Sequence, residues 1–140
     1  MSSPYQDYLA DQILEVIERF APLDGLFLDM TWDQPSSSEW AREAMLGLGL
    51  DPADAIDRAR CSRDLSHTWI ERYLKIIEPH LASDDASGVW FNSCPKTALG
   101  EEARFIRHVE IESLPSGGWG YSYFPYVSRF VRPFGRPTLS

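Results

Sequence analysis

The segment that most constrains this chain is 24–32, which reads Asp-Gly-Leu-Phe-Leu-Asp-Met-Thr-Trp. An apolar run that begins at Gly25 and ends at a carboxylate, Asp29, is typical of a short buried strand in a parallel sheet. In α/β folds the carboxyl ends of such strands carry the chemistry, because the loops that follow them meet at one edge of the sheet. The segment therefore predicts a strand near 24–30 that delivers Asp29 to a candidate site.

Two later segments repeat this arrangement. Residues 88–92 form an apolar run that ends on an amide, and residues 107–112 alternate polar and apolar side chains and end on a carboxylate. The regular order of helices and strands predicts an α/β fold with parallel strands in the order 1-2-3, joined by right-handed crossovers. With period two along each strand, Asp29, Asn92 and Glu112 share one face of the sheet. Helices are expected on the opposite face.

The helices follow from apolar stripes at helical spacing. One stripe runs through residues 3–20 and a second through residues 64–81. Between them, residues 33–63 form an insertion that is much longer than the usual connection of about two to six residues. Such an excess is typical of a loop over a binding face, with a neutral surface excursion as the alternative. Shorter helices are expected at 39–46, 99–106 and 126–132.

Length and charge restrict the classes of partner. The chain has 140 residues and is expected to form one domain over 1–140. Its formal net charge of -8 opposes a nucleic-acid or anionic-membrane partner. No run approaches the ~18 apolar residues of a membrane span and no apolar leader follows Met1, so we expect a cytoplasmic location, unless the chain is truncated. Cys61 and Cys94 have no disulfide or zinc spacing and are expected to be reduced.

His108, Glu110 and Glu112 alternate on one face of the third predicted strand, an arrangement that raises the question of a metal site. The three positions spread over roughly 13 Å along a strand, too far to converge on one ion. The chain also has no phosphate-binding loop and no dinucleotide fingerprint. We therefore expect neither a metal nor a cofactor, and we expect these polar groups to line a wet pocket or to pair with each other.

Five segments carry a family resemblance in their order and spacing: 24–32, 91–92, 110–115, 119–121 and 124–125. Segment 24–32 resembles the nucleophile strand of the α-L-fucosidases of glycoside hydrolase family 29 and of the related group known as hypothetical glycosyl hydrolase 6, and the other four segments continue the match to the hypothetical group. The resemblance implies a (β/α)8 TIM barrel in which the three predicted strands are roughly the fourth, fifth and sixth. Because such a barrel has eight strands, this chain is expected to be a partial barrel and a truncated fragment.

The resemblance places the catalytic nucleophile at Asp29. Glycoside hydrolysis needs a second carboxyl group to protonate the leaving oxygen. Glu112 is our candidate, because strands of the same parity project side chains into a common barrel layer. Glu110 and residues outside the chain are its rivals. The structural alternatives are a hydrogen bond that Asp29 accepts from the following loop, and a pair between Glu112 and Arg104 or Arg107.

Further side chains suit sugar binding. Asn92 and Glu110 are expected to bind sugar hydroxyls, with a structural loop amide as the alternative for Asn92. Trp32, Trp119 and Tyr121 have flat apolar faces that match the C–H face of a pyranose and polar edges that reach hydroxyls. Ordinary packing is the alternative for each of these rings.

The sequence therefore predicts a hydrolase of carbohydrate metabolism, a retaining, α-L-fucosidase-like glycosidase that is inactive as this fragment and whose partner is a carbohydrate substrate. One alternative is a non-catalytic carbohydrate-binding or assembly fragment of a barrel protein, and another is a small unrelated α/β domain. A partial barrel has open strand edges, so oligomerisation or aggregation is expected. The sugar, the linkage and the choice between retention and inversion stay open at this stage.

Overall fold

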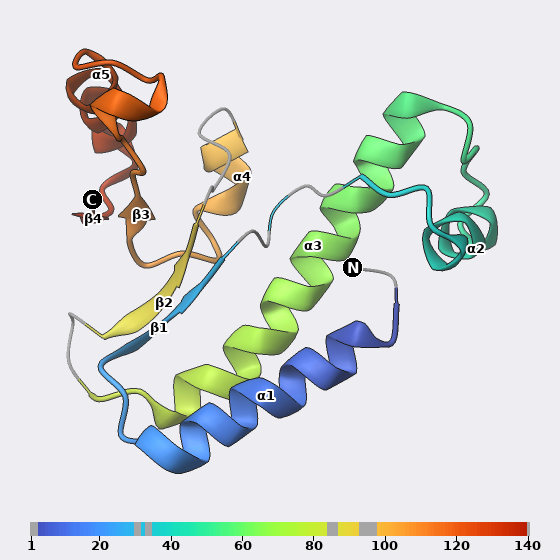
Figure 1. Cartoon of the computed structure of the whole chain (residues 1–140), viewed down its shortest axis with the longest axis horizontal. Coiled ribbons are helices and arrows are strands. Elements are labelled where there is room, and N and C mark those ends of the chain that lie inside the picture. Colours follow the sequence, from blue (N-terminus) through green and yellow to red (C-terminus); the bar gives the residue numbers. More distant parts are fainter. Residues whose placement is uncertain (1–2, 30–31, 33–34, 84–86, 93–97, 140) are drawn as a thin grey trace. The chain divides into compact units, whose positions relative to one another are not determined.

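The computed structural model describes residues 3–29, 32, 35–83, 87–92 and 98–139 (Figure 1). The chain divides into two compact units, and the expectation of one domain over 1–140 stays a prediction. The first unit comprises Met1–Leu23 and Thr31–His80, and the second comprises Asp24–Met30 and Leu81–Ser140. The first unit is built from helices, and the second holds the described strands.

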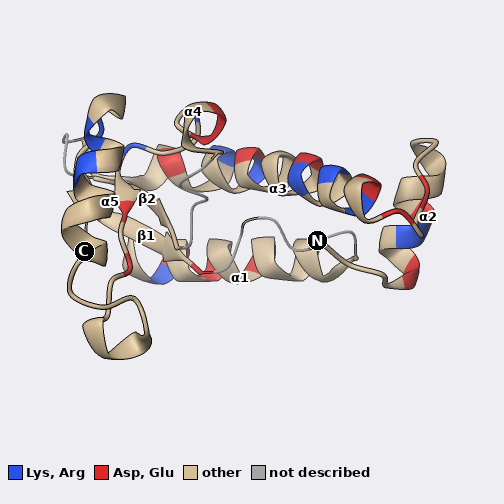
Figure 2. Ribbon diagram, turned by 90° about the horizontal axis from the view of Figure 1, so that it is seen from above, with Lys and Arg blue, Asp and Glu red and all other residues tan. Residues whose placement is uncertain are grey.

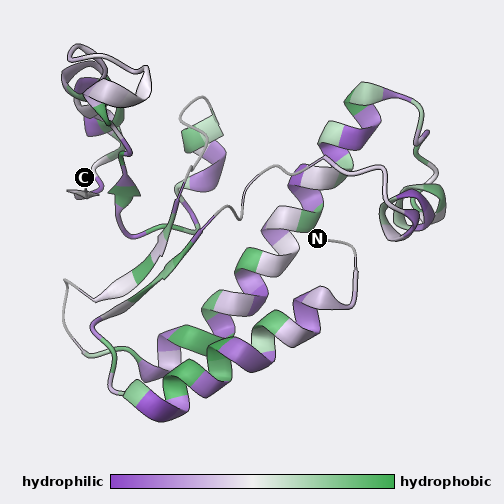
Figure 3. Ribbon diagram, viewed as in Figure 1, coloured by the Kyte–Doolittle hydropathy of each residue, from purple (hydrophilic) through white to green (hydrophobic). Residues whose placement is uncertain are grey.

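Two long helices, α1 (Tyr5–Phe20) and α3 (Ala55–Ile77), lie side by side in the first unit. Charges of both signs are spread along α3 (Figure 2), and hydrophilic and hydrophobic residues alternate along both helices (Figure 3). This spacing gives each helix one stripe that packs and one that faces water. The buried residues are Gln6, Ala10, Ile13 and Ile17 on α1, and Cys61, Ser62, Ser66, Ile70, Tyr73 and Ile77 on α3.

Side-chain caps set where α3 and α2 begin. Asp54 accepts hydrogen bonds from the backbone N–H groups of Ile56 at 2.8 Å and Asp57 at 2.9 Å, so α3 begins well before the predicted residue 64. A cap of this kind is worth about 1 kcal/mol. In α2 (Glu39–Gly47), the hydroxyl of the N-cap Ser38 accepts from the backbone of the third residue at 3.3 Å. The bounds of α2 lie within one residue of the predicted ones.

Polar contacts join α1 to α3. The Tyr73 hydroxyl donates a hydrogen bond to Gln6 Oε1, and Arg72 Nη1 lies 2.6 Å from Asp7 Oδ1. The Tyr73 side chain is 1% exposed. Burial raises the pKa of Tyr73 from 10.0 to about 12; the Arg72 charge opposes this shift, while Tyr5 and Asp7 add to it. Tyr73 is thus held in its neutral, hydrogen-bond-donating form.

We expect alkaline pH to destabilise the chain through Tyr73. Because the pKa of Tyr73 is higher in the folded chain, the folded state holds this proton more tightly than the unfolded state. The resulting stability is fully present below pH 10.0 and is lost as the pH rises toward about 12. At about 1.4 kcal/mol for each pKa unit, the loss is on the order of 2 to 3 kcal/mol.

Urea unfolding of the wild type, Tyr73→Phe and Tyr8→Phe at a series of alkaline pH values measures this loss. Tyr8 is 57% exposed on the same helix as Gln6 and serves as the control. The free energy of unfolding should fall less steeply with pH for Tyr73→Phe than for the wild type and the control. Equal slopes for all three proteins would contradict the assignment to Tyr73.

In the second unit, β1 (Gly25–Leu28) and β2 (Gly88–Phe91) form a parallel pair within the predicted ranges. The pairing aligns each strand residue for residue, from the two glycines at their starts to the two apolar residues at their ends. The backbone N–H of Asn92 donates to the carbonyl of Leu28 at 3.0 Å and so extends the pairing by one residue. Both strands therefore end at the same edge.

Side chains alternate across this pair. Val89 and Phe91 are 3% and 2% exposed, whereas Trp90 between them is half-buried. Phe27 is 50% exposed, and a Cβ atom added at Gly25 would come within 1.7 Å of the Trp90 ring. Gly25 therefore lies beneath the Trp90 ring and shares its face of the sheet. This alternation agrees with the period of two that the sequence shows.

The third predicted strand does not extend this sheet. Within the described residues, β3 (Val109–Glu110) pairs in parallel with β4 (Thr138–Leu139) and not with β2. The Val109 N–H donates to the Pro137 carbonyl at 2.8 Å, so the end of the chain occupies an edge of this short strand. The prediction of one three-stranded sheet in the order 1-2-3 is therefore wrong for the described residues, which form two separate pairs. A partial barrel stays a prediction.

Short helices complete the structure. The helix α4 (Leu99–Glu102) is shorter than predicted, and α5 (Tyr123–Val131) begins before the predicted residue 126. Among the residues that the structure describes, 3-10 helices occur at Glu78–His80, Pro115–Gly117 and Arg132–Phe134. In the described part of the chain, every helix is too short or too polar to cross a membrane.

Candidate functional site

Two of the predicted site residues meet at the carboxyl end of the β1–β2 pair. Asn92 Nδ2 donates a hydrogen bond to Asp29 Oδ1 at 2.6 Å. The two side chains meet because each follows the last residue of its strand, and these last residues, Leu28 and Phe91, are register partners. Asp29 is exposed. The amide thus orients a solvent-accessible carboxylate from the neighbouring strand through a charge-assisted hydrogen bond.

The other predicted carboxylates line a groove in the same unit. The groove has a volume of about 700 Å³ and is bounded by residues 110–115 with Tyr121, Phe124 and Pro125. Glu110 in its wall is 9% exposed, whereas Glu112 and Tyr121 are exposed. The volume lies within the range of about 300 to 1,000 Å³ that is common for small-molecule sites. The groove therefore combines two acid groups with aromatic and apolar faces.

Glycines shape the turn that carries Tyr121 to the groove. Gly118 has a φ of 95° and Gly120 a φ of 72°, both in the left-handed region that side chains disfavour. Both glycines lie between β3 and α5. Phe124 and Pro125, which also line the groove, were not among the predicted site residues. The signal that points to them is the apolar spacing of α5, which begins at Tyr123, before the predicted helix start.

The three predicted aromatic residues have different surroundings. Trp32 is 4% exposed and belongs to the first unit, so its ring face is covered and not open to a sugar. Trp119 is 39% exposed and stacks on Tyr123, with ring centroids 6.1 Å apart. Tyr121 is 88% exposed and lines the groove. Of the three, Tyr121 is best placed for the predicted stacking, and Trp32 is the least accessible.

His108 lies away from the Asp29–Asn92 pair. Its ring centroid is 5.6 Å from that of Trp90, and a Cβ atom added at Gly88 would lie 3.4 Å from His108 Nδ1. Gly88 is the first residue of β2, whereas Asn92 follows the last one. His108 therefore packs at the opposite end of the strand pair. Within the described residues, no group of three or more His, Cys, Asp or Glu side chains is arranged to hold a metal ion.

The cysteines add no activated nucleophile to the described structure. Cys61 is a free thiol, 2% exposed, inside the first unit. Burial raises the pKa of Cys61, and the nearby Asp64 carboxylate raises it further. Since the thiolate is the reactive form, these effects make the thiol inert. Cys94 lies outside the described residues.

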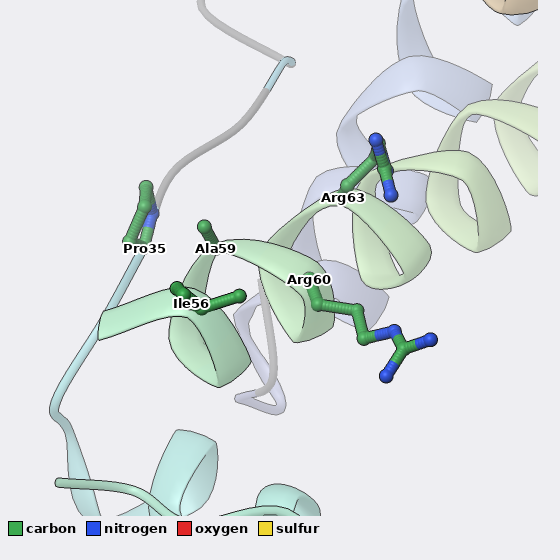
Figure 4. Close-up of a pocket in the computed structure, with 5 residues that line it drawn as sticks. All are labelled: Pro35, Ile56, Ala59, Arg60 and Arg63. Atoms are coloured by element: carbon green, nitrogen blue, oxygen red, sulfur yellow. The ribbon is translucent and has the colours of Figure 1, made fainter. Parts of the chain in front are cut away.

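A smaller hollow of about 380 Å³ lies in the first unit, within the predicted insertion 33–63. It is lined by Pro35, Ile56, Ala59, Arg60 and Arg63. In Figure 4 the two guanidinium groups extend away from Pro35 and Ile56, in different directions. Ligand sites usually direct a few polar groups at one point. The groove of the second unit is therefore the stronger candidate site.

No protein-family model matches the chain, and the comparisons with curated proteins and with solved structures also give no match. A functional assignment therefore rests on the residues themselves. The two features that bear on it are the Asp29–Asn92 hydrogen bond and the acidic, aromatic groove.

Proposed function

We propose that this chain is the central segment of a retaining glycoside hydrolase with α-L-fucosidase-like chemistry. The observation that carries the proposal is the Asp29 carboxylate, which is exposed at the end of β1 and held by Asn92 at 2.6 Å. A carboxylate nucleophile must reach the anomeric carbon and must be fixed in direction. The amide of Asn92 supplies that direction and leaves the second carboxylate oxygen of Asp29 for attack.

The groove supplies the second carboxyl group in this proposal. Glu112 is exposed in its wall and serves as the acid that protonates the leaving oxygen, then as the base that activates water. Glu110 is the rival, although its side chain is less accessible. In a retaining enzyme the two catalytic carboxyl groups lie about 5 to 5.5 Å apart, and in an inverting enzyme about 6.5 to 9.5 Å. We expect the shorter separation between Asp29 and Glu112 in the substrate-bound, active protein.

The lining of the groove supports a sugar as the substrate. Tyr121 and Phe124 offer aromatic faces for the C–H side of a pyranose, and the two glutamates accept hydrogen bonds from hydroxyl groups. This combination of apolar faces with a few polar groups is typical of small-molecule sites. An α-L-fucosyl residue suits such a lining because it combines three free ring hydroxyls with a methyl group.

A second candidate function is sugar binding without hydrolysis. The described residues form two separate strand pairs, far fewer than the eight strands of a closed barrel. If no further strands close the site, the groove still binds a sugar but does not hold both carboxyl groups at the reacting carbon. Hydrolysis of aryl α-L-fucosides and aryl galactosides by the full-length gene product separates the two functions. Binding of the product sugars with no turnover would favour the second.

We expect Glu112→Gln to affect substrates according to their leaving groups. Protonation of the leaving oxygen contributes about 10² to 10⁴ in rate, and activated aryl glycosides need little of it. The kcat/KM of the full-length gene product for an alkyl fucoside or a fucosyl disaccharide, which reports the step that protonates the leaving oxygen, should therefore fall by about that factor, and kcat/KM for a nitrophenyl fucoside much less. Glu110→Gln is the matched comparison. An equal loss on both substrate types would assign Glu112 to binding.

A further inference from the structure

The helix α5 carries a second stripe of side chains besides the one that it buries. Val127 and Val131 are 3% and 0% exposed and anchor the helix in the second unit. A separate hollow of about 520 Å³ lies along the helix. Its lining residues fall at positions i, i+3, i+4, i+7 and i+8 of one helical face: Ser122, Pro125, Tyr126, Arg129 and Phe130.

The two aromatic side chains of this α5 stripe are solvent-exposed and stack on each other. Tyr126 is 66% exposed and Phe130 is 41% exposed. Their rings are nearly parallel, with planes at 20° and centroids 6.3 Å apart. Two exposed rings that stack on each other offer a contiguous apolar face to a ligand. Flat apolar faces match the C–H faces of sugar rings.

The α5 stripe continues from the candidate site. Pro125 lines both the groove that contains Glu110 and Glu112 and the hollow beside Tyr126. Both hollows belong to the second unit. A chain of sugar residues that leaves the groove over Pro125 therefore reaches the stacked rings next. Continuity of this kind favours an extended ligand over two unrelated small ones.

The charges around α5 indicate the chemical class of its ligand. The chain has a formal net charge of -8, yet α5 contains no Asp or Glu, and Arg129 is the charged residue in the lining of its hollow. No carboxylate among the described residues lies within ion-pair distance of Arg129. Since the acidic chain as a whole repels anions, an anionic ligand needs such a local cation. A guanidinium matches the two oxygens of a carboxylate or a sulfate.

We propose that the α5 stripe is a subsite for an anionic sugar residue, a pyranose that carries a carboxylate or a sulfate, next to the groove. Tyr126 and Phe130 stack on the ring of this sugar, and Arg129 binds its oxyanion. The inference rests on the proposed function, because it extends the same carbohydrate ligand beyond the groove. The substrate that spans the groove and the α5 stripe is therefore an acidic oligosaccharide.

Titration calorimetry of the full chain with matched fucosylated oligosaccharides tests the subsite. The ligands are neutral, sulfated and uronate-bearing forms of one backbone, so that the two sources of negative charge are compared directly. The wild type should bind at least one charged form about tenfold more tightly than the neutral form, since a charge-assisted contact is worth about 1.5 to 3 kcal/mol. Arg129→Gln should remove this preference, and Tyr126→Ala should weaken binding of all forms.

Matched controls come from the first unit. Tyr8 is 57% exposed and its ring lies 5.8 Å from that of Tyr5, and Arg42 is exposed on α2. Tyr8→Ala and Arg42→Gln should leave every affinity unchanged. Because the substituted side chains are exposed, circular dichroism should show an unchanged fold for all four variants. A change of affinity in the controls as large as that in the α5 variants would overturn the subsite.

Four other outcomes are decisive. Unchanged charge preference in Arg129→Gln, or equal affinity of the wild type for all forms, would overturn the subsite while groove binding keeps the proposed function. Binding of the charged form at α5 by a full-length gene product that hydrolyses no glycoside would overturn the proposed function and keep the subsite. A dimer that Tyr126→Ala dissociates, with no sugar bound, would show that a second copy covers α5 and would overturn the subsite.

Discussion

Replacement of Asp29 by alanine in the full-length gene product is expected to lower kcat for aryl α-L-fucosides by roughly four to six orders of magnitude, the scale of loss when a covalent nucleophile is removed. In the proposed mechanism Asp29 attacks the anomeric carbon and forms the glycosyl-enzyme bond. Without that oxygen the covalent intermediate does not form. KM should change much less than kcat, because Asp29 acts mainly in the transition state.

Asp24→Ala is the matched control for this substitution. Asp24 is also an exposed carboxylate, but it lies just before β1, at the opposite end of the strand from Asp29. Its side chain should therefore be dispensable for turnover. Steady-state kinetics with wild type and both variants measure the effect. A kcat for Asp29→Ala within tenfold of the wild type, or an equal loss in Asp24→Ala, would remove Asp29 from the role of nucleophile.

Gly25→Ala is expected to cause the largest loss of stability of the substitutions considered. A Cβ atom at this position would lie 1.7 Å from the Trp90 ring and 2.7 Å from the Gly88 carbonyl oxygen. At these distances the neighbouring atoms must move. The backbone of β2 is less free to move than a side chain. Overpacking of this kind costs typically about 1 to 3 kcal/mol. We expect a loss at the upper end of that range.

Urea unfolding of the full chain measures this loss, with Gly47→Ala as the control. Nothing lies within 4 Å of a Cβ atom at Gly47, which ends α2. Alanine should therefore stabilise that helix by up to about 1 kcal/mol, the opposite sign from Gly25→Ala. Replacement of Trp90 by leucine in the Gly25→Ala background should restore part of the loss. A free energy of unfolding within ~0.5 kcal/mol of the wild type, the range of an ordinary surface substitution, would contradict the close packing of β1 against Trp90.

The spacing of apolar residues along the sequence predicts those helices and strands that form from residues close together in the chain. The helix α1 follows from its apolar stripe, and β1 and β2 follow from apolar runs bounded by glycine and a polar residue. The same patterns place Asp29 and Asn92 on one face at the strand ends. Their hydrogen bond was not predicted, because it depends on the register between two strands whose residues lie 63 positions apart.

Features that depend on distant partners are not visible in the sequence. Residues 138–139 carry no strand signal of their own and become β4 by pairing with β3. That pairing, and the division into two units, decide which carboxylates share a surface. Trp32 illustrates the same point, because nothing in the local sequence distinguishes its burial from the exposure of Tyr121. The early start of α3 is a different case, since its cap at Asp54 is a local signal that apolar spacing alone overlooks.

Covalent trapping of the nucleophile is the most direct test of the central claim. A 2-fluorinated fucosyl fluoride slows hydrolysis of the glycosyl-enzyme intermediate, which then accumulates on the attacking carboxylate. Mass spectrometry of the treated, proteolysed full-length gene product should find the sugar on the peptide that contains Asp29, and no label on that peptide in Asp29→Asn. A label on another carboxylate, or an active enzyme that gains no label, would contradict the assignment of Asp29 as the nucleophile of a retaining glycosidase.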